Sequence, residues 1–129
     1  MSEPEWIGYE VVLAIHSEQL AEHGGPQGIR DQALLEFALA GPKTLYHYSA
    51  DVTFSQLAAA YALGITANHP FIDGNKRTAW TVCAVFLELN GNPVMLDQSE
   101  VVEMMVGIAG GAIGEQQFAN WLSIGAADF

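Results

Sequence analysis

The chain has 129 residues, of which 15 are acidic and only four are Lys or Arg, giving a formal charge of −11. Half of the residues are apolar, which predicts one compact domain over residues 1–129. The negative charge argues against direct binding to DNA, RNA or an anionic membrane surface, because each of these needs a basic face on the protein.

Three features of the sequence predict a cytoplasmic protein. Cys83 is the only cysteine, so there is no internal disulfide and no cysteine-based zinc site. Residues 1–8 lack the basic start and apolar run of a secretory signal. Residues 52–72 lack Asp, Glu, Lys and Arg, but polar side chains and Pro70 interrupt them, which indicates a buried helix and a loop rather than a membrane span.

The hydrophobic pattern predicts an all-α fold of six helices with short connections. The first helix spans about residues 8–23 and ends at Gly24-Gly25-Pro26. The second begins after Asp31, a good N-cap, and is expected to end at Gly41-Pro42. Residues 41–53 are then expected to form a polar and aromatic loop.

The third and fourth helices flank a short loop. The third spans about residues 54–68, and Pro70 prevents its continuation. Gly74-Asn75 opens the fourth, which runs to Leu89 and carries one charge, Glu88, after its first turn, so we expect it to be central. The later elements are a short extended piece at residues 92–96, a fifth helix that follows Asp97 or Ser99 and ends at Gly110-Gly111, and a sixth helix over residues 115–123.

The loop and the start of the fourth helix, residues 69–77, carry the strongest functional signal. Lys76 and Arg77 are half of the four cations in the chain. They lie in a first helical turn, where cations are unfavourable unless they face a bound anion. Free amides at a helix N-terminus bind phosphate, and Gly74 lets the backbone approach it closely. The alternative for Arg77 is a salt bridge to a surface Glu.

Three further residues of this segment suit chemistry on phosphate. His69 can remove a proton from a hydroxyl near neutral pH. Asp73 offers a hard oxygen ligand for Mg²⁺ on phosphates, and Asn75 can cap the helix or reach the ligand. A base, a metal ligand, an anion cradle and cations are the parts that phosphoryl or nucleotidyl transfer from ATP needs.

The segment resembles the signature of the Fic/Doc family, His-x-Phe-x-(Asp/Glu)-(Gly/Ala)-Asn-(Gly/Lys)-Arg. Outside it, Ile15-His16, Gly24-Gly25, Gly28-Ile29-Arg30-Asp31 and Leu89-Asn90-Gly91 are similar to death-on-curing (Doc) toxins, so the resemblance covers most of the chain. It implies a compact six-helix Fic/Doc-like bundle with a central buried helix after the motif loop. The constrained motif positions are filled by His69, Phe71, Asp73, Gly74, Asn75, Lys76 and Arg77.

The resemblance implies a role for each motif residue. His69 is the general base on the acceptor hydroxyl, and Asp73 orients Mg²⁺. The remaining residues bind phosphate or support the loop: Gly74 and Asn75 as an anion nest, Lys76 and Arg77 as cations that offset developing charge, Phe71 as a core anchor and Pro70 as a stiffener.

Two positions separate the branches of the family. Fic adenylyltransferases usually carry Gly at the place of Lys76 and a second Arg at the place of Trp80. The Doc-like residues here imply a toxin kinase that transfers the γ-phosphate of ATP to a Thr or Ser hydroxyl of a translation protein, with elongation factor Tu as the expected target. Ala67 stands where Doc toxins often have a basic residue, which leaves fewer phosphate contacts. The alternatives are AMP transfer, or a scaffold that binds nucleotide without turnover.

Such a toxin needs an inhibitor. No (Ser/Thr)-x-x-x-Glu-(Gly/Asn) inhibitory motif occurs, since residues 17–21 and 99–103 do not match it. We therefore expect inhibition in trans by a small antitoxin whose disordered C-terminal segment folds onto the domain.

Residues outside the motif are expected to be mainly structural. His16 is interpreted as a core-edge histidine with a local hydrogen bond. Two interpretations of Arg30 remain: it pairs with a carboxylate, or it lies at the edge of the active site. Two interpretations of the aromatic stretch 46–48 also remain: its side chains pack against the core, or they form an edge where the target docks. We expect core packing for Trp80, Cys83, Phe86, Met104 and Met105, and a surface or loop position for His23 and His47.

Overall fold

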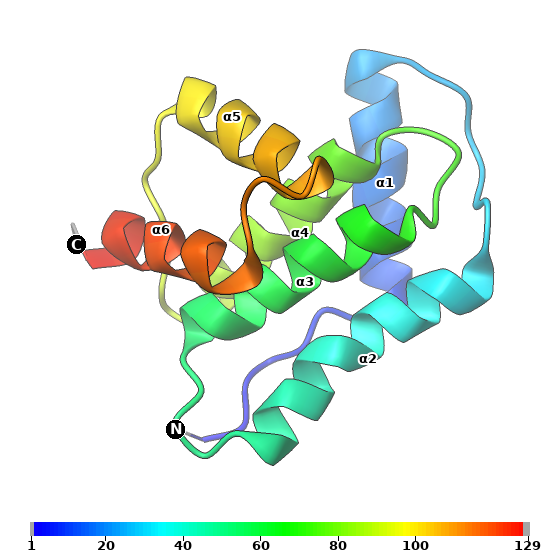
Figure 1. Cartoon of the computed structure of the whole chain (residues 1–129). Coiled ribbons are helices and arrows are strands. Elements are labelled where there is room, and N and C mark those ends of the chain that lie inside the picture. The colour runs from blue at the N-terminus through cyan, green and yellow to red at the C-terminus, as the bar shows by residue number, and fades with distance from the viewer. Residues whose placement is uncertain (1, 128–129) are drawn as a thin grey trace.

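The computed structural model describes residues 2–127, and six α-helices follow one another along the chain (Figure 1). Within those residues no strand forms, and a single β-bridge pairs Ile29 with Phe71. The predicted all-α fold is confirmed. The helices are α1 (Tyr9–His23), α2 (Gln32–Tyr48), α3 (Phe54–Asn68), α4 (Asn75–Leu89), α5 (Gln98–Ala109) and α6 (Glu115–Ala127).

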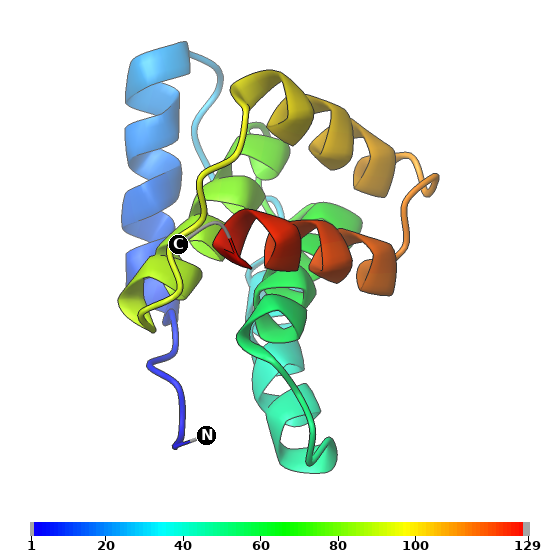
Figure 2. The same cartoon turned by 90° about the vertical axis from the view of Figure 1, so that its left-hand side faces the viewer.

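Helices α3 and α4 form the centre of the bundle. Helix α3 packs against α2, α4 and α6, while α4 also contacts α1 and α5, and the outer helices surround this pair in both views (Figures 1 and 2). The predicted central position of the fourth helix is confirmed. Its apolar side chains cover most of its circumference, and burying them removes apolar surface from water. The buried side chains of α4 beyond its first turn are Thr78, Ala79, Val82, Cys83, Phe86 and Leu87.

Several helix ends follow from local side-chain chemistry. The Asp31 side chain accepts a hydrogen bond from the Leu34 amide at the start of α2 (3.1 Å). Thr53 and Gln56 form a reciprocal capping box at the start of α3. Each cap satisfies an amide that has no partner inside its helix. The sequence therefore predicts these starts well.

The second helix is longer than predicted, and the predicted end at Gly41-Pro42 is wrong. Helix α2 continues through Pro42 to Tyr48, so most of the expected loop over residues 41–53 is helical. Pro42 lacks the amide that would bond to the carbonyl four residues earlier. However, Pro42 is buried, and Leu45 and Tyr46 pack against the core beyond it. This burial offsets the lost hydrogen bond.

Three further observations concern the expected connections and ends. The residues of the aromatic stretch 46–48 have different environments. Tyr46 packs edge-on against Trp6, with ring centroids 5.6 Å apart, whereas Tyr48 is 87% exposed. Residues 92–96 form no strand, and the sixth helix runs past residue 123 to Ala127.

The segment before α1 is tied to the central pair. The Ile7 amide donates to the Tyr61 hydroxyl on α3 (2.9 Å), and the Asn90 side chain bonds to both backbone groups of Glu5 (2.8 and 3.0 Å). On α4, Cys83 is fully buried, and this burial raises the pKa of its thiol far above the usual range, as expected for an inert cysteine. Within residues 2–127, no helix is long and apolar enough to cross a bilayer.

Candidate active site

The motif loop connects the C-terminus of α3 to the N-terminus of α4. His69 caps α3 in the left-handed region, with φ 49° and ψ 55°, and is the one non-glycine residue with positive φ among those described. Such a conformation is costly and persists where its surroundings fix it. The His69 side chain is exposed and has no hydrogen-bond partner within residues 2–127. It is therefore free to meet a substrate.

A cavity of about 320 Å³ opens between the end of α3, the start of α4 and the end of α5. Every residue predicted to act in catalysis or phosphate binding lies on its wall, whereas Pro70 and Phe71 are buried below it. The structure therefore brings these residues to one place. The lining residues are Thr66, His69, Asp73, Gly74, Asn75, Lys76, Arg77 and Ala109.

The N-terminus of α4 points unpaired amides at this cavity. Gly74 is the N-cap, in the left-handed region with φ 79° and ψ 17°, and no side chain caps the helix. Within the described part of the chain, the amides of residues 74–77 have no hydrogen-bond acceptor. Such amides, with the positive end of the helix dipole, bind anions.

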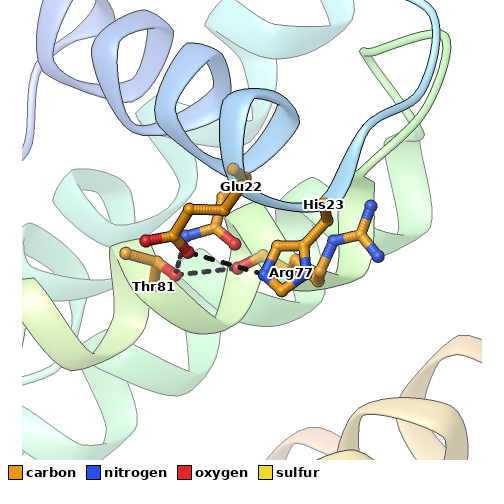
Figure 3. A network of polar contacts seen from close by, with 5 residues as sticks. Glu22, His23, Arg77 and Thr81 are labelled. Atoms are coloured by element: carbon orange, nitrogen blue, oxygen red, sulfur yellow. Dashed lines mark hydrogen bonds and ion pairs between the residues drawn. The ribbon is translucent and has the colours of Figure 1, made fainter.

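The two cations at this helix start are also unpaired. Lys76 and Arg77 are exposed, and the single ion pair of the described residues joins His23 to Glu22 instead (3.6 Å). In Figure 3 the dashed line to Arg77 ends at its backbone carbonyl, which accepts from the Thr81 hydroxyl (3.0 Å), while the guanidinium extends away. The surface salt bridge considered for Arg77 is thus absent from residues 2–127, and the guanidinium is available to a ligand.

The Asn75 side chain closes the loop from within. It is buried, its Oδ1 accepts from the Phe71 amide (3.0 Å), and its Nδ2 donates to the Phe71 carbonyl (2.9 Å). It caps no amide of α4. Both polar atoms of the side chain thus hold the loop backbone, and the backbone amide of Asn75, without an acceptor within residues 2–127, is open to an anion.

His16 supports the loop from the side of α1. It is buried, as expected, but its predicted local hydrogen bond is wrong. Its Nε2 lies 2.8 Å from the Asp73 carbonyl, 57 residues along the chain, and its ring stacks on Phe71 with centroids 3.8 Å apart and planes 7° apart. Phe71 is fully buried. The histidine is therefore part of the motif's support.

Arg30 supports the loop from the opposite end. Its Nε donates to the His69 carbonyl (2.7 Å), and its terminal nitrogen donates to the Asn68 carbonyl (2.9 Å). The backbone amides of Arg30 and Asp31 both donate to the Pro70 carbonyl (2.7 and 3.0 Å). Cations favour helix C-termini, where carbonyls lack partners. Arg30 is thus a cap of α3 and not a carboxylate partner.

Asp73 is the one acidic side chain on the cavity wall. It is half-buried, and its carboxylate lies against Gly25, in the turn after α1. No group of three potential metal-binding side chains exists among residues 2–127. A single carboxylate fits Mg²⁺ that takes its other ligands from water and nucleotide phosphates, and does not fit an all-protein metal site.

Two features of the surroundings were not found from the sequence. The Thr66 hydroxyl, one helical turn before His69, is shielded from solvent and has no partner among the described residues. A second cavity, of about 560 Å³, shares Lys76 and Arg77 with the first, and Trp80 and apolar side chains of α5 line it. The position of Trp80 is where adenylyltransferases usually carry their second Arg, and the indole side chain of Trp80 offers no charge to phosphate.

Comparison with known proteins identifies the family of this site. The chain matches the Fic/DOC family over residues 6–87. It is 29% identical over 116 residues to Protein kinase doc of Escherichia phage P1, covering 90% of this chain and 91% of that protein. It is 40% identical over 94 residues to Toxin Doc of Mycolicibacterium smegmatis, covering 72% of this chain and 70% of that protein. The match includes the motif loop, all of α3 and all but the last two residues of α4, and the chain belongs to the Fic/Doc family.

Proposed function

We propose that this protein is a toxin-type protein kinase that transfers the γ-phosphate of ATP to a Thr or Ser hydroxyl of a translation protein, with elongation factor Tu as the expected acceptor. One observation carries the proposal: an exposed histidine, two unpaired cations and the open N-terminus of α4 share one cavity. The names of the two relatives, a protein kinase and a toxin, support the reaction and the biological role.

His69 acts as the base in this reaction. It takes the proton of the acceptor hydroxyl while the hydroxyl oxygen attacks the γ-phosphorus. The bond from that phosphorus to the bridging oxygen breaks, and ADP leaves with the bonding electrons. The His69 backbone is held on both sides, since its amide donates to Ile65 (3.0 Å) and its carbonyl accepts from Arg30. This fixes the origin of the side chain while its imidazole stays free.

The start of α4 acts on the phosphates. Lys76, Arg77 and the free amides surround the place where negative charge spreads during transfer, and fixed dipoles there lower the barrier without reorganisation. Asp73 would hold Mg²⁺, which supplies further charge neutralisation when it is bound. Arg77 contributes a planar donor pair suited to phosphate oxygens.

Transfer of AMP is the second candidate, because the same base and anion site serve both reactions. Lys76 and Trp80 favour phosphate transfer. Lys76 intrudes on the flat cradle that would hold the α- and β-phosphates, and Trp80 takes the place of a second charge clamp. A scaffold that binds nucleotide without turnover is the third candidate, and the intact His69 argues against it.

The test follows two labels. The protein is incubated with ATP labelled at the γ- or the α-phosphate and with purified elongation factor Tu or a translation extract. We expect γ-label on a Thr or Ser of the acceptor, none from the α position, and none with His69→Ala. Transfer of α-label would establish AMP transfer instead. Tight ATP binding without transfer of either label would refute both transfer reactions and favour the scaffold that binds nucleotide without turnover.

The proposed role as a toxin includes a regulator. We expect expression of the chain to arrest growth, and a small antitoxin encoded beside it to relieve the arrest by binding this domain. Magnetic resonance of the antitoxin alone and in complex would show whether its C-terminal segment folds on binding. Arrest that persists with the neighbouring gene expressed would exclude that gene product as the inhibitor.

A further inference from the structure

His16 is a buried polar side chain that the proposed transfer does not use. It lies in the middle of α1, 6% exposed, with its ring against Phe71. An apolar residue would fill this space without the cost of burying a polar group. Instead, the imidazole Nε2 lies at hydrogen-bond distance from a backbone carbonyl at the entrance to α4, that of Asp73.

The partner defines which nitrogen of His16 carries hydrogen. A backbone carbonyl can only accept a hydrogen bond. At 2.8 Å from the Asp73 oxygen, Nε2 must therefore be the donor. His16 thus holds the Asp73 carbonyl on the α1 side of the loop.

The direction of this carbonyl determines the direction of the next amide. No peptide bond among the described residues is cis, and in a trans peptide the C=O and N–H groups point to opposite sides. The Gly74 amide is consequently turned away from α1. Gly74 borders the cavity, and its amide has no acceptor within residues 2–127. A glycine in the left-handed region could easily adopt another plane, so an external hold is useful here.

We infer that His16 is a positioning residue that presets the anion cradle. Its Nε2–H fixes the plane of the Asp73–Gly74 peptide, so that the Gly74 amide faces the phosphate before the ligand arrives. This inference rests on the proposed function in one respect, namely that the ligand of the cradle is a phosphate of ATP. An amide that is already aligned binds without paying the entropy of ordering the loop.

Two variants separate the hydrogen bond from the packing. In His16→Gln the amide nitrogen can take the place of Nε2 and keep the donor. In His16→Leu the bulk stays apolar and the donor is lost. The matched control is Gln19→Leu, one turn along α1, which removes a side-chain bond from α1 to Thr81 on α4 (3.1 Å) and leaves the loop untouched.

The measurement is a titration with inorganic pyrophosphate, followed through the Gly74 amide in ¹⁵N-labelled protein, together with calorimetry of ATP binding. We expect His16→Leu to bind both ligands about tenfold more weakly, because one charge-assisted hydrogen bond is misaligned. His16→Gln and Gln19→Leu should bind them like the unaltered protein. Thermal unfolding of each variant reports whether the fold is retained.

A folded His16→Leu that binds like the unaltered protein would overturn the inference. So would a His16→Gln as weak as His16→Leu, since the ring and not the donor would then matter. The imidazole ¹⁵N spectrum of the unaltered protein tests the same point without any variant. Hydrogen on Nε2 is expected, and hydrogen on Nδ1 alone would contradict it.

Failure of the proposed function would look different. If the protein transfers no label but the Gly74 amide still responds to pyrophosphate in a manner that depends on His16, the kinase reaction is refuted and the positioning role stands. If the Gly74 amide does not respond to pyrophosphate, the positioning role is refuted, whatever the transfer assay shows.

Discussion

The two sides of the motif loop differ in whether their polar groups have partners. On the cavity side, the His69 imidazole and the side chains of Lys76 and Arg77 have none within residues 2–127. On the rear side, His16 and Asn75 are bonded to loop backbone groups, and Arg30 performs the same task at the end of α3. The free groups carry the proposed chemistry, and the bonded groups fix where the free groups stand.

This contrast has an energetic meaning. Two cations in the first turn of a helix oppose its dipole, and a left-handed His69 costs energy. The rear bonds, together with the stack of His16 on Phe71, offset these costs. Substitutions on the cavity side should therefore remove function and leave stability unchanged, whereas substitutions on the rear side should lower stability first.

The largest effect is expected on the cavity side, from His69→Ala. General base catalysis contributes about 10²–10⁴-fold to a rate, so transfer of γ-label should fall by that factor. Circular dichroism and the unfolding temperature should not change, since the imidazole has no bond to lose. The matched control is His47→Ala, at another exposed histidine. A folded His69→Ala protein with full transfer and full toxicity would remove His69 from the mechanism.

The next effect is expected on the rear side, from Asn75→Ala. Both backbone groups of the buried Phe71 lose their partner, and each unsatisfied buried group costs about 1–3 kcal/mol. We expect urea unfolding to show a loss of roughly 2–6 kcal/mol. Asn75→Asp keeps the acceptor for the Phe71 amide but sets a buried carboxylate oxygen against the Phe71 carbonyl, so it should lose stability as well. The exposed Asn120→Ala on α6 serves as control, and an Asn75→Ala protein as stable as this control would contradict the loop closure.

On the cavity side, Arg77→Ala is expected to lower ATP affinity without lowering the stability of the fold. Charge-assisted bonds to phosphate are worth about 1.5–3 kcal/mol, so ATP affinity should fall by roughly 10- to 150-fold. The free energy of unfolding should stay unchanged or rise slightly, because a cation leaves the positive end of α4. Lys43→Ala, an exposed residue on α2, removes the same charge away from the cavity. Equal ATP affinity of these two variants would show that the phosphates bind elsewhere.

The sequence predicts what local chemistry decides. The starts of α2 and α3 follow from Asp31 and Thr53, whose bonds lie within three residues. The motif residues are also neighbours in the chain, so their meeting at one cavity needs only a loop and a helix start. The continuation of α2 depends on the burial of Pro42 in the folded bundle, and no local pattern contains that information.

The rear support was missed for the same physical reason. His16 meets its partner 57 residues away, and Arg30 meets its partners 38 and 39 residues away. The composition of α1 gives no sign that one of its histidines faces the motif loop. Only the folded positions of α1 and of the segment before α2 define these contacts. The residues that carry the proposed chemistry are therefore easier to predict from the sequence than the distant residues that hold them in place.

The smallest expected effect is that of Arg30→Ala, on the rear side at the end of α3. Two exposed hydrogen bonds to the Asn68 and His69 carbonyls disappear, and water can replace part of each, so we expect urea unfolding to show a loss of about 1 kcal/mol. Arg30→Lys has one compact donor group instead of a planar fork, so its stability should lie between that of Arg30→Ala and that of the unaltered protein. The transfer rate should fall more than ATP affinity, because the backbone of His69 is loosened while the start of α4 is not. An unchanged rate at unchanged stability would show that the two remaining backbone bonds to Pro70 suffice to hold the base.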